Sequence, residues 1–175
     1  MCTLTLANWA VGCKSIGGVT ALYVIDKADR ISNSITYAIA NSVLTITGTG
    51  GTYYKIDPTQ NSFSISNPTN ASGDANSLFY LQSIAGMMHG NTAAGTALVE
   101  QINKGRTEWL VEFADGTYRM MGTDTAGMEA DGGDGLASGQ AAGDAKGSTL
   151  SLSCQSTYIA PTVAFDSFTA AFTQG

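Results

Sequence analysis

Charged side chains are scarce in this chain. Of its 175 residues only 13% are Asp, Glu, Lys or Arg, whereas ordinary soluble domains have roughly 25%. The 14 acidic residues outnumber the 8 basic ones and give a formal net charge of −6. Tight binding to nucleic acid normally needs clustered Lys and Arg, so the few scattered basic residues argue against it. A subunit that covers its neutral surface with copies of itself would need no more charge than this.

Histidine and cysteine are also rare. His89 is the single histidine, so a Ser/His/Asp triad would depend on it, and no GxSxG nucleophile motif accompanies it. The three cysteines, Cys2, Cys13 and Cys154, include no CxxC pair, which disfavours a structural zinc site and a disulfide framework. We expect small buried thiols in a reducing compartment, with a Cys13–Cys154 bridge as the alternative.

Long apolar runs are missing as well. No segment reaches the ~18 consecutive apolar residues of a membrane-spanning helix. The first residues lack the basic region that begins a secretory signal peptide. We therefore expect a protein that is made in a cytoplasm and stays there, or that leaves with a particle at lysis, and that has no membrane partner.

Short β-prone runs, separated by glycine and turn residues, fill most of the chain. An Asp115-Gly116 pair between two such runs predicts a hairpin turn. One helix is predicted over Thr92–Lys104 from apolar residues at helical spacing, with Gly105 after its end. Strands are expected at residues 19–25, 31–40, 42–47, 52–56, 62–66, 76–88, 106–113, 118–122 and 148–156, with an edge strand at 162–165.

This order of elements predicts a mainly β (α+β) fold. We expect a subunit that forms a β-sandwich or barrel, with one flanking helix and long loops. A single domain is expected over residues 1–163, and the last residues, 164–175, are interpreted as a C-terminal docking tail.

A long stretch of small residues and carboxylates, Gly122–Thr149, joins two of the predicted strands. Loops of this length are uncommon in compact domains unless they are functional or disordered. Its carboxylates admit three interpretations: a solvated acidic loop, which is the ordinary one, a glycosidase pair, or a calcium site, although DGGDG matches no calcium-binding repeat. We favour an assembly loop that becomes ordered against a partner. Its candidate residues are Gly122, Asp124, Glu129, Asp131, Asp134 and Asp144.

A series of turn residues and strands follows the same order as in a known family. The series resembles the tail tube (major tail) proteins of tailed bacteriophages, or a closely related virion structural protein, over about residues 10 to 163. The residues that carry this resemblance are Gly12-Cys13-Lys14, Gly17-Gly18, Tyr53-Tyr54, the hairpin at Asp115-Gly116 ending at Gly122, Gly127-Met128-Glu129, Gly143-Asp144, Gly147, Thr149-Leu150 and Ala160-Pro161.

The resemblance implies a structural protein of the virion tail, assembled in the host cytoplasm, with neither enzymatic activity nor a cofactor or metal. Such subunits form hexameric rings whose inner strands build a continuous β-barrel around a channel, and long loops connect stacked rings and other tail proteins. Gly122–Thr149 and Asn67–Asn76 are then the candidate stacking loops. An acidic wall would repel phosphates and let DNA pass without sticking. The candidate channel-lining residues, on the strands 53–57 and 76–88, are Tyr53, Lys55, Tyr80 and Gln82.

Three other functions stay open at this point. The chain could be a different virion part, namely a tail terminator, a neck ring or a capsid decoration protein. It could be a secreted adhesin or carbohydrate-binding module, although no export signal favours that. It could be an enzyme whose site is the acidic loop, with Asp131 and Asp134 as the residues to test.

Overall fold

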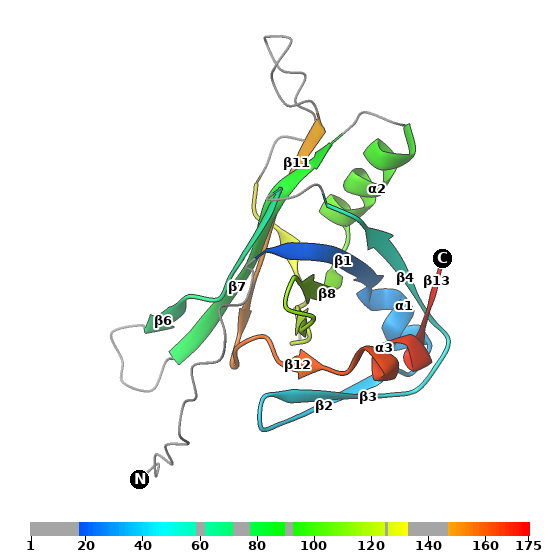
Figure 1. The fold of residues 1–175 in the computed structure, drawn as a ribbon, viewed down its shortest axis with the longest axis vertical. Coiled ribbons are helices and arrows are strands. Elements are labelled where there is room, and N and C mark those ends of the chain that lie inside the picture. The colour runs from blue at the N-terminus through cyan, green and yellow to red at the C-terminus, as the bar shows by residue number, and fades with distance from the viewer. Residues whose placement is uncertain (1–17, 59–61, 72–77, 90–92, 125, 133–146) are drawn as a thin grey trace.

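Two β-sheets and three helices form the part of the chain that the computed structural model describes, namely residues 18–58, 62–71, 78–89, 93–124, 126–132 and 147–175. The fold is mainly β with helices at its margin, which confirms the predicted class (Figure 1). The prediction of a single helix was wrong. The helices are α1 (Lys27–Ser32), α2 (Ala93–Lys104) and α3 (Phe165–Ala171).

The larger sheet has eight strands and curls around one side of the molecule. In spatial order its strands are β13 (Phe172–Gln174), β4 (Gly51–Ile56), β1 (Val19–Asp26), β8 (Thr107–Phe113), β9 (Tyr118–Met121), β12 (Thr162–Val163), β3 (Val43–Thr47) and β2 (Thr36–Ala40).

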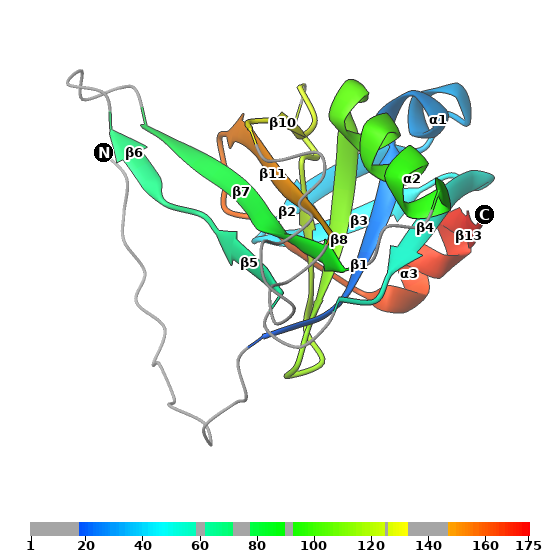
Figure 2. The same ribbon diagram turned by 90° about the horizontal axis from the view of Figure 1, so that it is seen from above.

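The smaller sheet has five strands. Four of them are hydrogen-bonded side by side in the spatial order β10 (Glu129–Ala130), β11 (Gly147–Ser156), β7 (Leu78–His89) and β5 (Phe63–Ser66). The fifth, β6 (Thr69–Ala71), pairs with β7 beyond the end of β5. β7 and β11 pair over ten residue positions, from Gly147 opposite His89 to Ser156 opposite Tyr80. Seen from above, these two long strands lie beside β8 and β1 and cross them at an angle (Figure 2).

Two hydrophobic cores lie on the two faces of the curled sheet. Leu22 and Trp109 face the smaller sheet and pack on its Ile84 and Leu152. Tyr23 and Leu110, one residue along, face the inside of the curl. Because both faces of β1 and β8 are buried, these strands show continuous apolar runs rather than alternation.

The helix α2 confirms the predicted element. Val99 and Ile102 are 3% and 2% exposed, whereas Gln101 is exposed. The backbone N–H of Gly105 donates to the carbonyl of Gln101 at 2.9 Å and closes the helix. Its apolar side packs into the core between the two sheets.

The expected strand over residues 31–40 is a helix followed by a shorter strand. Asp26 caps α1, since its carboxylate accepts a hydrogen bond from the Ala28 N–H at 2.9 Å. Ile31 is therefore on a helix and is 59% exposed, and β2 begins only at Thr36. Tyr37 and Ile39 do alternate with exposed residues along β2, but this strand is shorter than predicted.

Residues 164–175, which were interpreted as a docking tail, are part of the sheet and the core. α3 lies across the curl, and β13 pairs in parallel with β4. Phe168 and Phe172 are 0% and 1% exposed. Gly51 permits the close approach of β13, because a Cβ atom there would lie 2.4 Å from the Phe172 ring. The tail is thus integral to this fold rather than a separate docking segment.

Candidate assembly surface

The outward side of the smaller sheet is a surface of small, uncharged side chains. Ser83 on β7 is opposite Ser66 on β5 and Ser153 on β11, and the Ser66 and Ser83 hydroxyl oxygens lie 2.6 Å apart. Alternate residues of β7 point the other way, and Ile84 is 0% exposed. We call this surface the serine face. Its side chains, all exposed or half-buried, are Ser64, Ser66, Leu81, Ser83, Ala85, Met87, Thr149, Ser151, Ser153 and Gln155.

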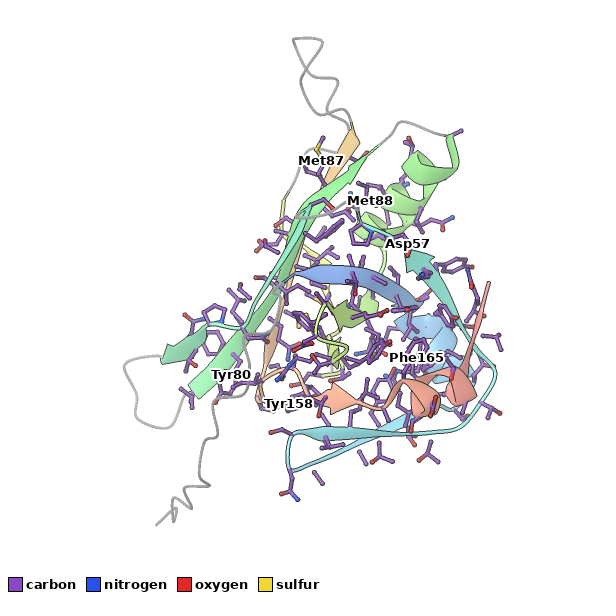
Figure 3. All side chains as sticks on the ribbon, viewed as in Figure 1. Asp57, Tyr80, Met87, Met88, Tyr158 and Phe165 are labelled. Carbon is purple, nitrogen blue, oxygen red and sulfur yellow. The ribbon has the colours of Figure 1, made fainter. Side chains whose placement is uncertain are left out.

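No Asp, Glu, Lys or Arg occurs in β5, β6, β7 or β11. The alternation is visible at the end of β7, where Met87 and Met88 point to opposite sides of the strand (Figure 3). Met88 packs against the core between the sheets, and Met87 belongs to the serine face. A charge-free face of this extent is unusual for a chain with net charge −6, because exposed surfaces of soluble domains normally mix charges of both signs.

One ion pair borders the serine face. Glu129 on β10 is opposite Ser153, and its carboxylate lies 2.8 Å from Nε of Arg106. Both side chains are more than half exposed, so this pair contributes only about 0–1 kcal/mol to stability. The two charges neutralise each other at the margin and leave the face itself neutral.

The first part of the predicted assembly loop is folded onto the domain. Gly122 is buried with φ of 74° and its N–H donates to Oε1 of Gln82 at 2.9 Å. The carbonyl of Asp124 accepts a hydrogen bond from Nζ of Lys27 at 2.6 Å, and the Asp131 N–H donates to the Ser151 carbonyl at 2.8 Å.

A single long loop was expected over residues 122–149, but part of this segment forms strands. β10 occupies 129–130, and β11 begins at 147. Asp134 and Asp144 lie outside the described residues, so four of the six candidates have a described position: Gly122, Asp124, Glu129 and Asp131.

The structure does not bring the predicted channel-lining residues together. Tyr53 and Lys55 are on β4 in the larger sheet, and Tyr80 and Gln82 are on β7 in the smaller one. Tyr53 packs against Phe168 inside the curl, with ring centroids 5.2 Å apart. Lys55 forms a surface ion pair with Asp57 at 2.8 Å (Asp57 is labelled in Figure 3).

Gln82 was expected on the channel surface but is completely buried. Its Nε2 donates to the Tyr158 carbonyl at 3.1 Å, and its Oε1 also lies 3.6 Å from the Cys154 thiol. It faces the core, on the side of β7 opposite to the serine face. Gln82 thus lies on the inward side of β7, and the serine and alanine at 83 and 85 were the sequence signal for the outward side.

Cys154 is a free thiol on the inner side of β11, as the sequence suggested for a small buried cysteine. Burial raises its pKa from 9.0 to about 11, so it stays protonated at neutral pH. Cys2 and Cys13 lie outside the described residues.

A second buried polar cluster ties α1 to the larger sheet. Glu108 on β8 is 0% exposed; Nε of Arg30 lies 2.9 Å from its carboxylate and the Tyr37 hydroxyl donates to it at 2.7 Å. Nζ of Lys27 is 4.0 Å away. Burial raises the pKa of Glu108, against the opposing influence of Tyr37 and Arg30, and burial lowers the pKa of Lys27. With no exposed surface, this carboxylate stabilises the fold and offers no open site for a substrate.

Among the described residues, no group of three or more His, Cys, Asp or Glu side chains is placed to hold a metal ion. The helices in that part of the chain are all too short or too polar to cross a lipid bilayer. Comparisons of the chain with protein families, with curated proteins and with solved structures found no significant match.

Proposed function

We propose that this chain is a self-assembling structural protein, a subunit of a tube of the kind that tailed bacteriophages use to conduct DNA. The observation that carries the proposal is the serine face, which lines the channel in the assembled state. It is long, neutral and made of short side chains, and it is held rigid by the ten-position pairing of β7 with β11.

A wall with these properties suits the passage of DNA. Proteins hold the phosphate backbone mainly through Lys and Arg, and the serine face offers none. Hydroxyl groups keep such a wall wetted, while the net charge of −6 per subunit repels the phosphates at longer range. When this surface is repeated around a ring, DNA would not bind to the channel wall, even though the wall itself has no carboxylates.

The sheet edges support assembly with identical copies. β2 ends the larger sheet with one strand neighbour, β3, among the described strands, and it contains neither a charged residue nor a proline. Monomeric proteins usually protect such edges with charges, bulges or proline, because an open edge pairs with other chains. Ring closure would pair these edges and remove that hazard.

Electron microscopy of the purified chain over a range of concentrations tests the proposal. We expect rings or tubes of uniform diameter. Closed single rings that never stack would point instead to a tail terminator or a neck ring. A chain that remains a monomer at high concentration, by microscopy and by analytical ultracentrifugation, contradicts the proposal.

A charge on the serine face tests which way this face points. The variant Ser83→Lys/Ser151→Lys should still assemble, and its tubes should retain double-stranded DNA at low salt, unlike the wild type. The control Asn103→Lys adds a positive charge on the exposed side of α2. Tubes of this variant should retain no double-stranded DNA in the channel. If the double variant no longer assembles while Asn103→Lys does, the serine face is buried between subunits and does not line the channel.

A further inference from the structure

A pocket opens between α1, α2 and the adjoining parts of β1 and β4, on the right side of the molecule in Figure 1. Its volume is about 300 Å³, comparable to that of roughly ten water molecules and at the lower end of the range for small-molecule sites. Val24 and Ile102 line it and also belong to the core between the two sheets. The pocket is therefore the place where this core reaches the surface.

The floor of the pocket is apolar, and one side carries an aromatic ring. Val24 and Ile102 are buried there, and Leu98 is half-buried. Tyr54 is the residue of β4 opposite Val24 and is 47% exposed. A short chain of methylene groups would find contacts on this floor, and the face of an aromatic ring attracts a neighbouring cation.

The other half of the lining is polar and contains two carboxylates whose hydrogen bonds come from neutral groups. One oxygen of Asp26 accepts from the Ala28 N–H at 2.9 Å, and its other oxygen has no hydrogen-bond partner among the described residues. Asp29 accepts from the Thr52 N–H at 2.7 Å and from the Asn33 side chain at 3.1 Å. Neither carboxylate forms an ion pair within the described part of the chain.

The basic side chains that the structure describes are all engaged with other groups. The partners are Glu108 for Lys27 and Arg30, Asp57 for Lys55, Glu100 for Lys104, Glu129 for Arg106 and the Ala160 carbonyl for Arg119. Within the described residues no cation is left to balance Asp26 and Asp29. A cation from outside would therefore meet two carboxylates, an aromatic ring and an apolar floor in one pocket.

We infer that this pocket binds a primary aliphatic amine, whose ammonium group contacts Asp26 and Asp29 and whose methylene chain lies on the apolar floor beside Tyr54. A purely apolar ligand would remove water from the two carboxylates without replacing it, which is unfavourable. An anion would be repelled by both carboxylates, and a bare metal ion would leave the apolar floor unused. The inference does not rest on the proposed function, because the pocket shares no residue with the serine face or with β2.

Equilibrium dialysis of the full chain against radiolabelled putrescine at low salt tests this inference. We expect saturable binding of one amine per chain. Butylamine should compete for the site, and butanol, which has the same chain length and no charge, should not. Nα-acetyl-lysine methylamide serves as a further competitor. If it competes more strongly than butylamine, the amine that the pocket takes is a lysine side chain of another protein, and if it competes less strongly, the ligand is a free amine.

Two pairs of variants place the bound amine in the pocket. Gln101 lines the pocket and is exposed, so Gln101→Lys should put a competing ammonium group there and abolish binding. Asn103→Lys makes the same change of net charge on the same helix outside this pocket and should bind as the wild type does.

Asp26→Asn removes one negative charge and keeps the helix cap, because Asn and Asp cap helices about equally well. It should weaken binding about three- to fivefold, as expected for the loss of one partly exposed charge pair. Asp166→Asn removes the same charge from the first turn of α3 and should leave binding unchanged.

Equal competition by butanol and butylamine overturns the inference, as does binding that does not saturate. Equal losses for Gln101→Lys and Asn103→Lys, or for Asp26→Asn and Asp166→Asn, would mean that the net charge of the chain attracts the amine, which also overturns it. Circular dichroism of the four variants should match the wild type, because all four side chains are exposed. None of these outcomes affects the proposed function, which electron microscopy of the same samples tests separately.

Discussion

Gln82 and Gly122 are 40 positions apart in the sequence, yet the side-chain amide oxygen of Gln82 accepts a hydrogen bond of 2.9 Å from the backbone N–H of Gly122. The same side chain donates to the carbonyl of Tyr158. The inner side of β7 thereby holds both the start of the 122–132 segment and the chain after β11. The outer side of the same strand is the serine face, so the candidate channel wall and the candidate assembly segment share one rigid support.

Gln82→Ala should destabilise the fold. It leaves the buried Gly122 N–H and the half-buried Tyr158 carbonyl without this partner, and an unsatisfied buried group costs about 1–3 kcal/mol. We expect a drop of about 2–4 kcal/mol in the free energy of unfolding, measured by urea denaturation. Gln155→Ala, on the outward side of β11, should change it by less than about 0.5 kcal/mol. Equal effects of the two substitutions would contradict the role assigned to Gln82.

Glu108→Ala should lower the free energy of unfolding by about 3–5 kcal/mol, because it leaves Arg30 and Lys27 without their buried carboxylate. Glu112 lies two residues further along β8 on the same side and accepts a hydrogen bond from Tyr23 at 2.9 Å. It is only half-buried, so Glu112→Ala should cost about 1 kcal/mol. Thermal and urea unfolding of both variants measure the two losses of stability. A loss for Glu112→Ala as large as that for Glu108→Ala would contradict the prediction.

Phe172→Ala should destabilise the fold by about 3–5 kcal/mol, the usual loss for a large aromatic side chain removed from a core. The Phe172 ring stacks on Phe168 with centroids 5.1 Å apart and covers Gly51. Thr173→Ala, on the exposed next residue, is the matched control and should have little effect. If Phe172→Ala were as stable as the control in urea, residues 164–175 would act as a tail after all.

The fold should weaken in alkaline solution. Burial raises the pKa values of Tyr23 and Tyr37 well above their ordinary value of 10.0, and their hydrogen bonds to Glu112 and Glu108 add to this. A folded-state pKa above the unfolded one means that stability is complete below pH ~10 and is lost as pH rises beyond it.

Absorbance of tyrosinate against pH checks this expectation. In the wild type, two tyrosines should ionise only together with the loss of near-ultraviolet circular dichroism. Tyr37→Phe removes one of these two groups and should therefore make the loss of stability with rising pH less steep. Free titration of every tyrosine at pH ~10 in the folded protein would refute the burial argument.

Much of the secondary structure could be predicted from local pattern. A strand was predicted over 148–156, and β11 has its Leu150, Leu152 and Cys154 buried at every second position. Asp115-Gly116 predicted a hairpin, and Gly116 has φ of 79°. These signals are local, because a strand with one buried face records that face in every second residue, and a tight turn needs a residue that tolerates positive φ.

The helix α1 shows where local pattern fails. It has six residues, too few to be stable alone. Its Arg30 binds a carboxylate that is 78 positions away in the sequence. No window around residues 27–32 contains that partner, and the neighbouring apolar residues favoured a strand.

Composition, alternation and turn chemistry were thus enough for the mainly β class, the long strands and the low charge content of the chain. The curl of the larger sheet, the burial of Gln82 and the burial of residues 164–175 depended on contacts between segments tens of residues apart. Their stabilising contacts form only when the chain has closed on itself, so their free energy is a property of the folded arrangement and is not encoded in any single stretch.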